Sequence, residues 1–105
     1  EKARNGELSP EDVKGSTFTL TNPGIFGSLF GMGIINQPNV AILSTGAIEK
    51  KPAVKETEYG DAVFIRSIMY MTLGYDHRII DGAYGSQFLV FIKKYLETID
   101  LNRDI

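Results

Sequence analysis

The 105-residue sequence contains no cysteine and only one histidine. Without cysteine, the chain can hold no disulfide framework, no thiolate nucleophile and no zinc site built from sulfur ligands. A single imidazole beside carboxylates is a poor set of metal ligands, so we expect no metal site. Basic residues are not in excess either, because 11 Lys and Arg face 13 Asp and Glu. Since phosphate binding requires a basic excess, we expect no nucleic-acid partner.

Long apolar runs are missing as well. A membrane-spanning helix needs about 20 consecutive apolar residues, and no run in the sequence comes near that length. The chain does not open with the basic region and apolar core of a secretory signal. With 43% hydrophobic residues it is nevertheless too apolar for a disordered chain. We therefore expect one folded domain at most, with no membrane partner, in the cytoplasm or in the matrix of an organelle.

The first residues carry signals of a helix end rather than of a translation start. There is no initiator Met, and Asn5-Gly6 follows Glu1–Arg4 in the way that the last turn of a helix ends. We therefore expect the chain to be a fragment of a longer protein. Downstream, Ser9-Pro10-Glu11-Asp12 predicts a short helical turn, with Ser9 as its N-cap and Pro at its first position.

Alternation of threonine with apolar residues predicts a half-buried strand over 16–21, with Phe18 and Leu20 on one side. Asn22-Pro23-Gly24 ends this strand. The segment 24–33 then carries four glycines among large apolar side chains. Its spacing is not GxGxxG, and no Lys-Ser or Lys-Thr pair follows. We therefore expect a closely packed loop here rather than a phosphate-binding loop.

The middle of the sequence is rich in strand-forming residues. Residues 40–48 predict a mostly buried strand, and residues 53–56 and 62–65 predict the two arms of a hairpin. Residues 62–75 form one long β-prone run that is apolar on both faces around 69–73. A strand that is covered on both faces is typical of the centre of a sheet, so we expect this run to supply the central strand.

The last element is an amphipathic helix that begins after Asp81-Gly82. Its apolar residues recur at the spacing of one helix face, and they are Tyr84, Phe88, Phe91, Ile92, Tyr95, Leu96 and Ile99. Strands followed by a helix, with a short turn before them, indicate an α+β or mixed α/β fold.

The single histidine, His77, lies between the long β-prone run and this helix. A neutral imidazole with a pKa of about 6.5 is suited to accepting a proton at neutral pH, and carboxylate or Arg neighbours can fix its ring and its charge. Asp76, Arg78 and Asp81 are all within four residues of it. In the plainer interpretation, His77 is a surface loop residue and Asp81 is only the N-cap of the helix.

These residues carry a resemblance to a known family. The segment GYDHRIIDGA resembles the HxxxDG signature of the chloramphenicol acetyltransferase-like superfamily, in the DHRxxDGA form of the dihydrolipoyl acyltransferase cores of 2-oxo acid dehydrogenase complexes. The upstream segment GSTFTLTNPGIFGSLFGMGIINQPNVAILSTGAIEKKP is similar to the family's GxTFTxxNxG and PxxNxPxxAIL stretches, in the same order. HxxxDG alone is weak, but the two blocks together are specific, and the match runs from Ala3 to Leu96.

The resemblance implies an α/β (α+β) fold, a two-layer sandwich with a mixed β-sheet and flanking helices. It implies that residues 1–105 are the C-terminal part of one acyltransferase catalytic domain, without the lipoyl and peripheral-subunit-binding domains. It also implies a homotrimer that assembles into a larger cubic or dodecahedral core, with decarboxylase and dihydrolipoyl dehydrogenase subunits as partners. The location would be the cytoplasm of a bacterium or the mitochondrial matrix.

The implied activity is acyl transfer between dihydrolipoyl-lysine, carried on a separate domain, and coenzyme A, a substrate. His77 matches the family's general base, and Thr21 falls where the family carries a hydroxyl that stabilises the oxyanion. Asp81 matches the acidic position of the motif, where the family pairs a structural carboxylate with an Arg. That Arg is either Arg78 or one outside these residues. The family places the His and the hydroxyl on neighbouring subunits, and the residues that contact coenzyme A stay unassigned.

The acyl group is predicted from fewer residues. Thr at position 21, with Asn22 and Gly24 after it, is similar to succinyltransferases of the 2-oxoglutarate complex, so we favour succinyl. Residues 34–38 and 95–100 also resemble branched-chain or mixed-specificity relatives. The alternatives are therefore a branched-chain acyl or acetyl transferase, or a non-catalytic scaffold or binding module with the same fold.

Overall fold

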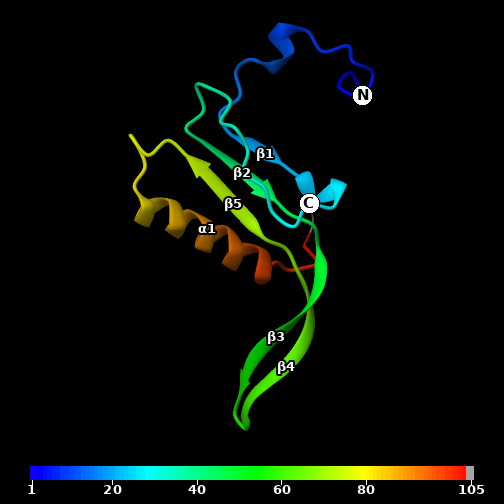
Figure 1. Ribbon diagram of the computed structural model, residues 1–105, viewed down its shortest axis with the longest axis vertical. Coiled ribbons are helices and arrows are strands. Elements are labelled where there is room, and N and C mark those ends of the chain that lie inside the picture. Colours follow the sequence, from blue (N-terminus) through cyan, green and yellow to red (C-terminus); the bar gives the residue numbers. More distant parts are fainter. Residues whose placement is uncertain (104–105) are drawn as a thin grey trace.

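The computed structural model describes residues 1–103 (Figure 1). Its elements are a 3₁₀ turn at Pro10–Val13, β1 at Thr19–Thr21, a 3₁₀ turn at Pro23–Phe26, β2 at Ala41–Thr45, β3 at Glu49–Thr57, β4 at Gly60–Ile68, β5 at Met71–Tyr75 and α1 at Gly82–Glu97. The molecule is elongated, with principal extents of 58 × 36 × 30 Å. The predicted helical turn after Ser9 is confirmed, with Ser9 and Asp12 forming a capping box.

The centre of the fold is a three-stranded sheet in the order β1-β2-β5. β1 runs parallel to β2, and β2 runs antiparallel to β5. The buried hydrophobic residues are Ala41, Ile42 and Leu43, all on β2. The expectation that the 62–75 run supplies the central strand is therefore wrong for residues 1–103. β5 lies at an edge, and it is apolar on both faces because both of its faces are covered.

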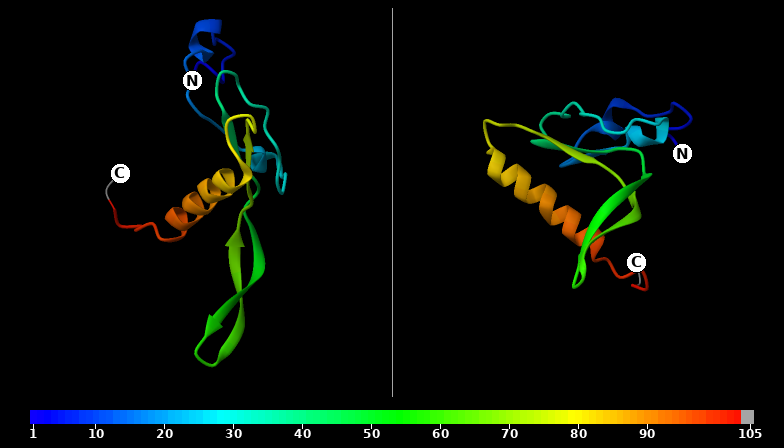
Figure 2. Two further views of the ribbon diagram at one scale, coloured as in Figure 1. Left: turned by 90° about the vertical axis from the view of Figure 1, so that its left-hand side faces the viewer. Right: turned by 60° about the horizontal axis from the view of Figure 1, so that its bottom comes forward.

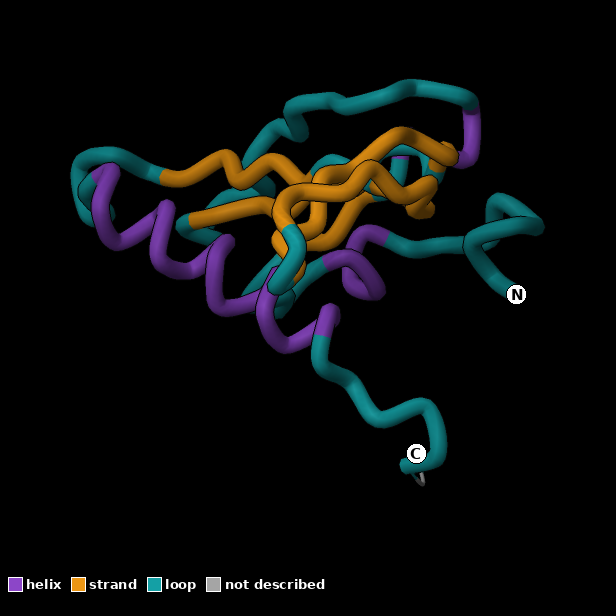
Figure 3. The backbone as a smooth tube through the Cα atoms, turned by 90° about the horizontal axis from the view of Figure 1, so that it is seen from below, coloured by secondary structure: helices purple, strands orange, loops and turns teal. Residues whose placement is uncertain are grey.

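A helix and a loop cover the two faces of this sheet, as Figures 2 and 3 show. On one face, α1 comes so close to β5 that a Cβ atom added to Gly85 would lie 2.9 Å from the ring of Tyr75. On the other face, the backbone N of Gly33 donates to Ser44 Oγ at 3.2 Å. A Cβ atom on Gly33 would lie 2.5 Å from Ile42 Cδ1. The close approach predicted for the glycine loop is confirmed at its glycines, whereas large apolar side chains of the loop such as Phe26 and Met32 are exposed.

The remaining two strands, β3 and β4, form a hairpin that projects away from the sheet and the helix (Figure 1). Its register runs from the Glu49 and Ile68 pair to the Thr57 and Gly60 pair. The hairpin is thus predicted correctly but is longer than the 53–56 and 62–65 arms. Pro52 fits inside β3 because an edge strand can spare one donor.

The expected strand over 16–21 is shorter in the structure and faces the other way. Only Thr19–Thr21 pairs with β2, and Leu20 is 66% exposed while its two threonine neighbours are partly covered. The mixed α/β architecture is confirmed, and residues 1–103 contain one α-helix rather than several. The segment between β5 and α1 therefore lies at the end of the sheet where β5 finishes.

Candidate active site

His77 lies in the loop that joins the end of β5 to the start of α1, the yellow segment of Figure 1. The loop is tied to the sheet at its first residue, because the backbone N of Asp76 donates to the carbonyl oxygen of Val40 at 2.8 Å. It is tied to the helix at its last residue, because the backbone N of Tyr84 donates to Asp81 Oδ1 at 2.7 Å. Asp81 is therefore the N-cap of α1, as predicted.

The two charged neighbours of His77 pair with each other. Arg78 donates to Asp76 three times, from its backbone N at 3.0 Å, from Nε at 2.9 Å and from Nη2 at 2.8 Å. The hydrogen bonds from the Arg78 side chain are the main cause that lowers the pKa of Asp76 to about 2. Of the two Arg partners that were open for Asp81, Arg78 is excluded in this structure, because its side chain binds Asp76.

The imidazole of His77 is exposed. Its ring centroid lies 5.5 Å from that of Tyr75, at an interplanar angle of 45°. Within residues 1–103, no hydrogen bond engages either ring nitrogen of His77. Beside the ring lies a groove of about 640 Å³, which the loop around Pro38 and the loop around His77 line together. An exposed, unengaged imidazole at the edge of a groove is open to a substrate proton.

Thr21 belongs to a row of three hydroxyls that crosses the sheet. Register pairs Thr21 with Ser44 and Ser44 with Thr72, so the three side chains share one face. Ser44 Oγ accepts from the backbone N of Gly33, and Thr72 donates to the carbonyl oxygen of Gly31. In the described part of the chain, the hydroxyl of Thr21 makes no hydrogen bond. Thr21 is the member of the row that can serve a ligand.

The structure does not bring Thr21 and His77 together within one chain. Thr72 marks the row of Thr21 on β5, and Tyr75 is the last strand residue before the loop of His77. Three residues of strand span about 10 Å, and Thr21 is also two strands away across the sheet, at about 5 Å per strand. The His77 imidazole and the Thr21 hydroxyl therefore lie at opposite ends of the sheet.

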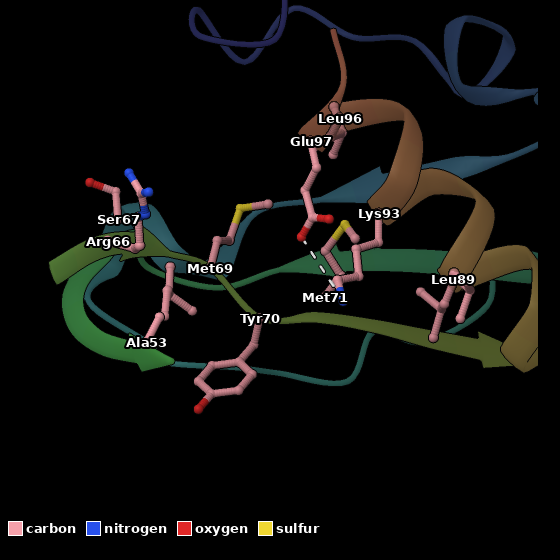
Figure 4. A pocket seen from close by; sticks show the side chains of 12 residues that line it. Ala53, Arg66, Ser67, Met69, Tyr70, Met71, Leu89, Lys93, Leu96 and Glu97 are labelled. Atoms are coloured by element: carbon pink, nitrogen blue, oxygen red, sulfur yellow. Dashed lines mark ion pairs between the residues drawn. The ribbon is translucent and has the colours of Figure 1, made fainter. Parts of the chain in front are cut away.

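A second hollow, of about 860 Å³, lies between the base of the hairpin and α1 (Figure 4). Its side chains are largely apolar, among them Met69, Met71 and Leu89. Lys93 and Glu97 stand at its rim and form an ion pair at 4.0 Å. No imidazole borders this hollow, and its lysine and carboxylate are paired with each other. The groove beside His77 is therefore the better candidate for proton transfer.

Residues 1–103 contain neither a metal-binding cluster nor a membrane-spanning helix. Over residues 1–103, no three His, Cys, Asp or Glu side chains gather as a metal site. Within the same residues, no helix combines the length and the apolar character needed to cross a bilayer.

Sequence reasoning missed the contribution of Asp76, which had no predicted role. The available signal was an Asp two residues before an Arg, because an Asp side chain often accepts a hydrogen bond from the backbone two residues on. Asn39 was also missed. It is buried, and its Nδ2 donates to Ser16 Oγ at 2.9 Å and to Thr19 Oγ1 at 3.3 Å, which ties the loop along the groove to the start of β1.

Comparison with known proteins identifies relatives over nearly the whole chain. A family model described as the catalytic domain of 2-oxoacid dehydrogenases acyltransferase matches residues 1–102. The chain is 50% identical over 97 residues to the mitochondrial dihydrolipoyllysine-residue succinyltransferase component of the 2-oxoglutarate dehydrogenase complex of Bos taurus, covering 92% of this chain and 20% of the relative. It is 41% identical over 105 residues to the dihydrolipoyllysine-residue acetyltransferase component of the pyruvate dehydrogenase complex of Corynebacterium glutamicum, covering 100% of this chain and 16% of the relative.

Solved structures resemble the fold. A probable dihydrolipoamide acetyltransferase of Listeria monocytogenes matches with a TM-score of 0.86 and 41% identity, over 99% of this chain and 43% of that chain. A second match is the dihydrolipoamide acetyltransferase of Azotobacter vinelandii, with a TM-score of 0.81 and 31% identity, over 92% of this chain and 38% of that chain. That enzyme was studied for the roles of a serine, a histidine and an asparagine in its catalytic mechanism. The cubic core of a pyruvate dehydrogenase multienzyme complex matches with a TM-score of 0.81 and 30% identity, over 92% of this chain and 38% of that chain.

Proposed function

The chain belongs to the 2-oxoacid dehydrogenase acyltransferase family of catalytic domains, and we propose that it is part of an enzyme that transfers an acyl group between dihydrolipoyl-lysine and coenzyme A. The observation that carries this proposal is His77, exposed beside a groove and held in the DHRxxDG segment at the end of β5. The chain spans 43% of the similar Listeria chain, and the order of its motifs favours the C-terminal part of the catalytic domain for residues 1–105. The lipoyl and peripheral-subunit-binding domains would lie outside these residues.

The proposed reaction begins with His77 as general base. The attacking group is the thiol of coenzyme A. A thiol of pKa about 8.5 is only slightly ionised at neutral pH, so His77 takes the proton of this thiol as its sulfur attacks. The new sulfur–carbon bond forms at the thioester carbonyl of the acylated dihydrolipoyl group, and the carbonyl electron pair moves to oxygen. When the oxyanion collapses, the bond to the dihydrolipoyl sulfur breaks, and His77 returns the proton to that sulfur. The reverse reaction uses the same groups.

The hydroxyl of Thr21 would donate a hydrogen bond to the oxyanion. Because Thr21 and His77 lie at opposite ends of one sheet, the hydroxyl would come from a neighbouring subunit of a homotrimer. The study of the Azotobacter enzyme examined a serine and a histidine together, and Thr21 offers the same hydroxyl chemistry as that serine.

Asp81 would position the loop rather than transfer a proton. In the Azotobacter enzyme an asparagine stands four residues after the histidine, as Asp81 stands four residues after His77. Asn and Asp are equally good N-caps, but only Asp carries a charge. Asp81 caps the helix here, a role that an asparagine could also fill.

The transferred group is proposed to be succinyl, with acetyl and branched-chain acyl groups as alternatives. The relatives include succinyltransferase and acetyltransferase components, at 50% and 41% identity in the two cases described. Thr21-Asn22 is the sequence feature that favours succinyl. In the full-length protein, kcat/KM should be at least tenfold higher with succinyl-coenzyme A than with acetyl-coenzyme A. A preference for acetyl-coenzyme A would overturn the succinyl assignment and leave the reaction class intact.

The proposed assembly is a trimer within a larger cubic or dodecahedral core, together with decarboxylase and dihydrolipoyl dehydrogenase subunits. Support comes from the similar fold of a pyruvate dehydrogenase cubic core. The proposed location is the bacterial cytoplasm or the mitochondrial matrix. Analytical ultracentrifugation of the full-length protein should give a mass of at least a trimer, and a monomer with full activity would contradict the shared site.

The decisive experiment replaces the base. In the full-length enzyme, His77→Ala should lower kcat at least 100-fold, because a positioned base contributes about 100-fold to 10,000-fold. Tyr59→Ala at the exposed tip of the hairpin is the matched control and should leave kcat unchanged. If His77→Ala keeps activity within tenfold of the parent, the base assignment is wrong. An inactive but correctly assembled parent would favour the non-catalytic scaffold.

A further inference from the structure

The function proposed above leaves the charged pair on either side of His77 without a role. We propose that Asp76 is a positioning residue for His77, and that Arg78 locks Asp76 in the positioning geometry. This inference rests on the proposed function, because it concerns how the same imidazole is held. Neither residue needs to touch the substrate.

The first support is the backbone around His77. The amides of Ile79 and Ile80 both donate to the carbonyl oxygen of Asp76, at 3.0 and 2.9 Å. The amide of Asp76 donates to Val40 on the strand side, at 2.8 Å. Asp76 thus binds both the sheet and the chain beyond His77, and His77 stands inside the turn that these bonds close. This turn fixes the backbone from which the imidazole projects, and the ring itself lies 5.5 Å from that of Tyr75.

The second support is the carboxylate of Asp76, which closes a second ring of bonds over the same turn. Asp76 Oδ1 accepts from both the backbone N and Nε of Arg78, and Oδ2 accepts from Nη2. This bidentate fork fixes both the position and the plane of the carboxylate. The side chain of Asp76 is 19% exposed, whereas that of Arg78 is 84% exposed. Arg78 therefore shields the carboxylate of Asp76 from solvent, while the backbone N of Asp76 is bound to Val40.

The fork is better suited to fixing geometry than to stabilising the fold. Exposed ion pairs contribute little to folding, so a pair of this kind can affect the geometry of the turn more than the stability of the fold. Reacting groups must be placed to within a fraction of an ångström, and a misplacement of about 1 Å can cost about 100-fold in rate. A turn that carries a proton-transferring imidazole gains from every bond that narrows its range of conformations.

The competing explanation is a turn that merely helps the loop to fold. A structural role would lower stability and assembly, and kcat would fall only as folded protein is lost. A positioning role lowers kcat in fully assembled enzyme while KM for coenzyme A changes little, because substrate binding does not require the correct direction of the imidazole.

The experiment uses the full-length assembled enzyme with graded variants. Asp76→Ala removes the whole carboxylate and should lower kcat about tenfold to 100-fold, with KM for coenzyme A within twofold. Asp76→Asn keeps an oxygen that can accept from the backbone N of Arg78, so its kcat should fall less than that of Asp76→Ala. Arg78→Lys keeps the positive charge but loses the bidentate guanidinium, so its kcat should fall almost as far as that of Arg78→Gln.

Because Asp76 and Arg78 act as one unit, the double variant Asp76→Asn with Arg78→Gln should be no slower than the slower single variant. The matched control is Glu11→Gln, which breaks another short ion pair, that of Lys14 with Glu11 at 2.9 Å, outside the groove. Its kcat should equal that of the parent. Sedimentation and thermal melting of each variant show whether the assembly is intact.

The outcomes separate this proposal from the function on which it rests. Loss of kcat in assembled Asp76 and Arg78 variants, with KM preserved, supports positioning. Parent-like kcat in assembled Asp76→Asn and Arg78→Gln, while His77→Ala is inactive, overturns positioning and leaves the function standing. A kcat that falls only in step with loss of assembled protein also overturns it. Full activity of His77→Ala contradicts the assignment of His77 as the base, and the positioning role of Asp76 with it. An assembled parent without acyl transfer contradicts the function itself.

Discussion

At the scale of single residues, the row of Thr21, Ser44 and Thr72 shows how position decides chemistry. The three residues carry the same functional group and face the same side of the sheet. Ser44 and Thr72 hold the glycine loop against that face, and Ser44 is 2% exposed. Thr21, on the outer strand, holds nothing among residues 1–103. A hydroxyl that the fold does not use is one that a reaction intermediate can use.

We therefore expect Thr21→Ala in the full-length enzyme to lower kcat about 100-fold to 1,000-fold, with little change in KM, because the oxyanion forms only after binding. Thr21→Ser keeps the hydroxyl and should retain most of the activity. Steady-state kinetics of the two variants beside the exposed control Thr17→Ala make the test. Unchanged turnover in Thr21→Ala would remove this residue from the site.

The lowered pKa of Asp76 also predicts how the stability of the folded protein depends on pH in acid. The folded-state pKa of this residue is about 2, below the ordinary 3.8, because Arg78 donates to the charged form. A lowered folded-state pKa means that its stabilising effect is complete above about pH 4 and is lost as the pH falls towards 2. Circular dichroism should show less acid sensitivity in Asp76→Asn than in the parent between pH 4 and 2. Parallel acid transitions in the two proteins would contradict the ion pair.

Residue-scale prediction from sequence succeeded where one local rule acted alone. Asp81 is the N-cap of α1 because an Asp before a helix-forming run accepts from the first free amides. The sequence left open whether the Arg that pairs with Asp81 is Arg78 or one outside these residues, because proximity in a loop does not determine which side chains meet. The structure pairs Arg78 with Asp76 through bonds that span only two residues of the chain. The bond from Asp76 to Val40 joins distant residues, and no spacing rule predicts it.

At the scale of elements, the close contact between α1 and β5 controls where the His77 loop ends. Gly85 is the buried residue of α1, and a Cβ atom there would press on the ring of Tyr75. We expect Gly85→Val to destabilise the full-length protein by about 1–3 kcal/mol and to lower kcat, because the helix start must move and carry Asp81 with it. Ser86→Ala on the exposed side is the control. Chemical unfolding and kinetics measure the two effects, and a neutral Gly85→Val would show that the helix is not held there.

Periodic elements were predictable and their pairing was not. Helix α1 followed from its apolar spacing, and the hairpin followed from two β-prone arms around a turn. The order β1-β2-β5 did not follow, since apolar faces do not say which edge of a strand finds a partner. The 62–75 run also divides at Met69 and Tyr70, so that its halves, β4 and β5, join different sheets.

At the scale of the whole molecule, apolar surface exceeds apolar interior. The buried hydrophobic residues are Ala41, Ile42 and Leu43, whereas large apolar side chains such as Phe26, Met32 and Ile34 are 82–91% exposed. Val54 and Val63, which pair across the hairpin, are about 70% exposed. Such a surface is typical of chains that complete their core with further polypeptide or further subunits.

We therefore expect the isolated 105-residue polypeptide to associate or to unfold without cooperativity. A chain of this size buries too little apolar surface to offset the entropy of folding when much of that surface is still in water. Sedimentation and urea titration of residues 1–105 beside the full-length protein provide the comparison. A cooperative, monomeric 105-residue polypeptide would contradict this expectation.

In the proposed trimer with shared sites, the separation of Thr21 from His77 along the sheet has a consequence for mixed assemblies. Two inactive proteins, one with Thr21→Ala and one with His77→Ala, each keep the half that the other has lost. Unfolded together in equal amounts and refolded, they should regain about a quarter of the parent activity, because about three quarters of random trimers are hybrid and each hybrid closes one intact site in three. Such intersubunit complementation is impossible for a site contained within one chain.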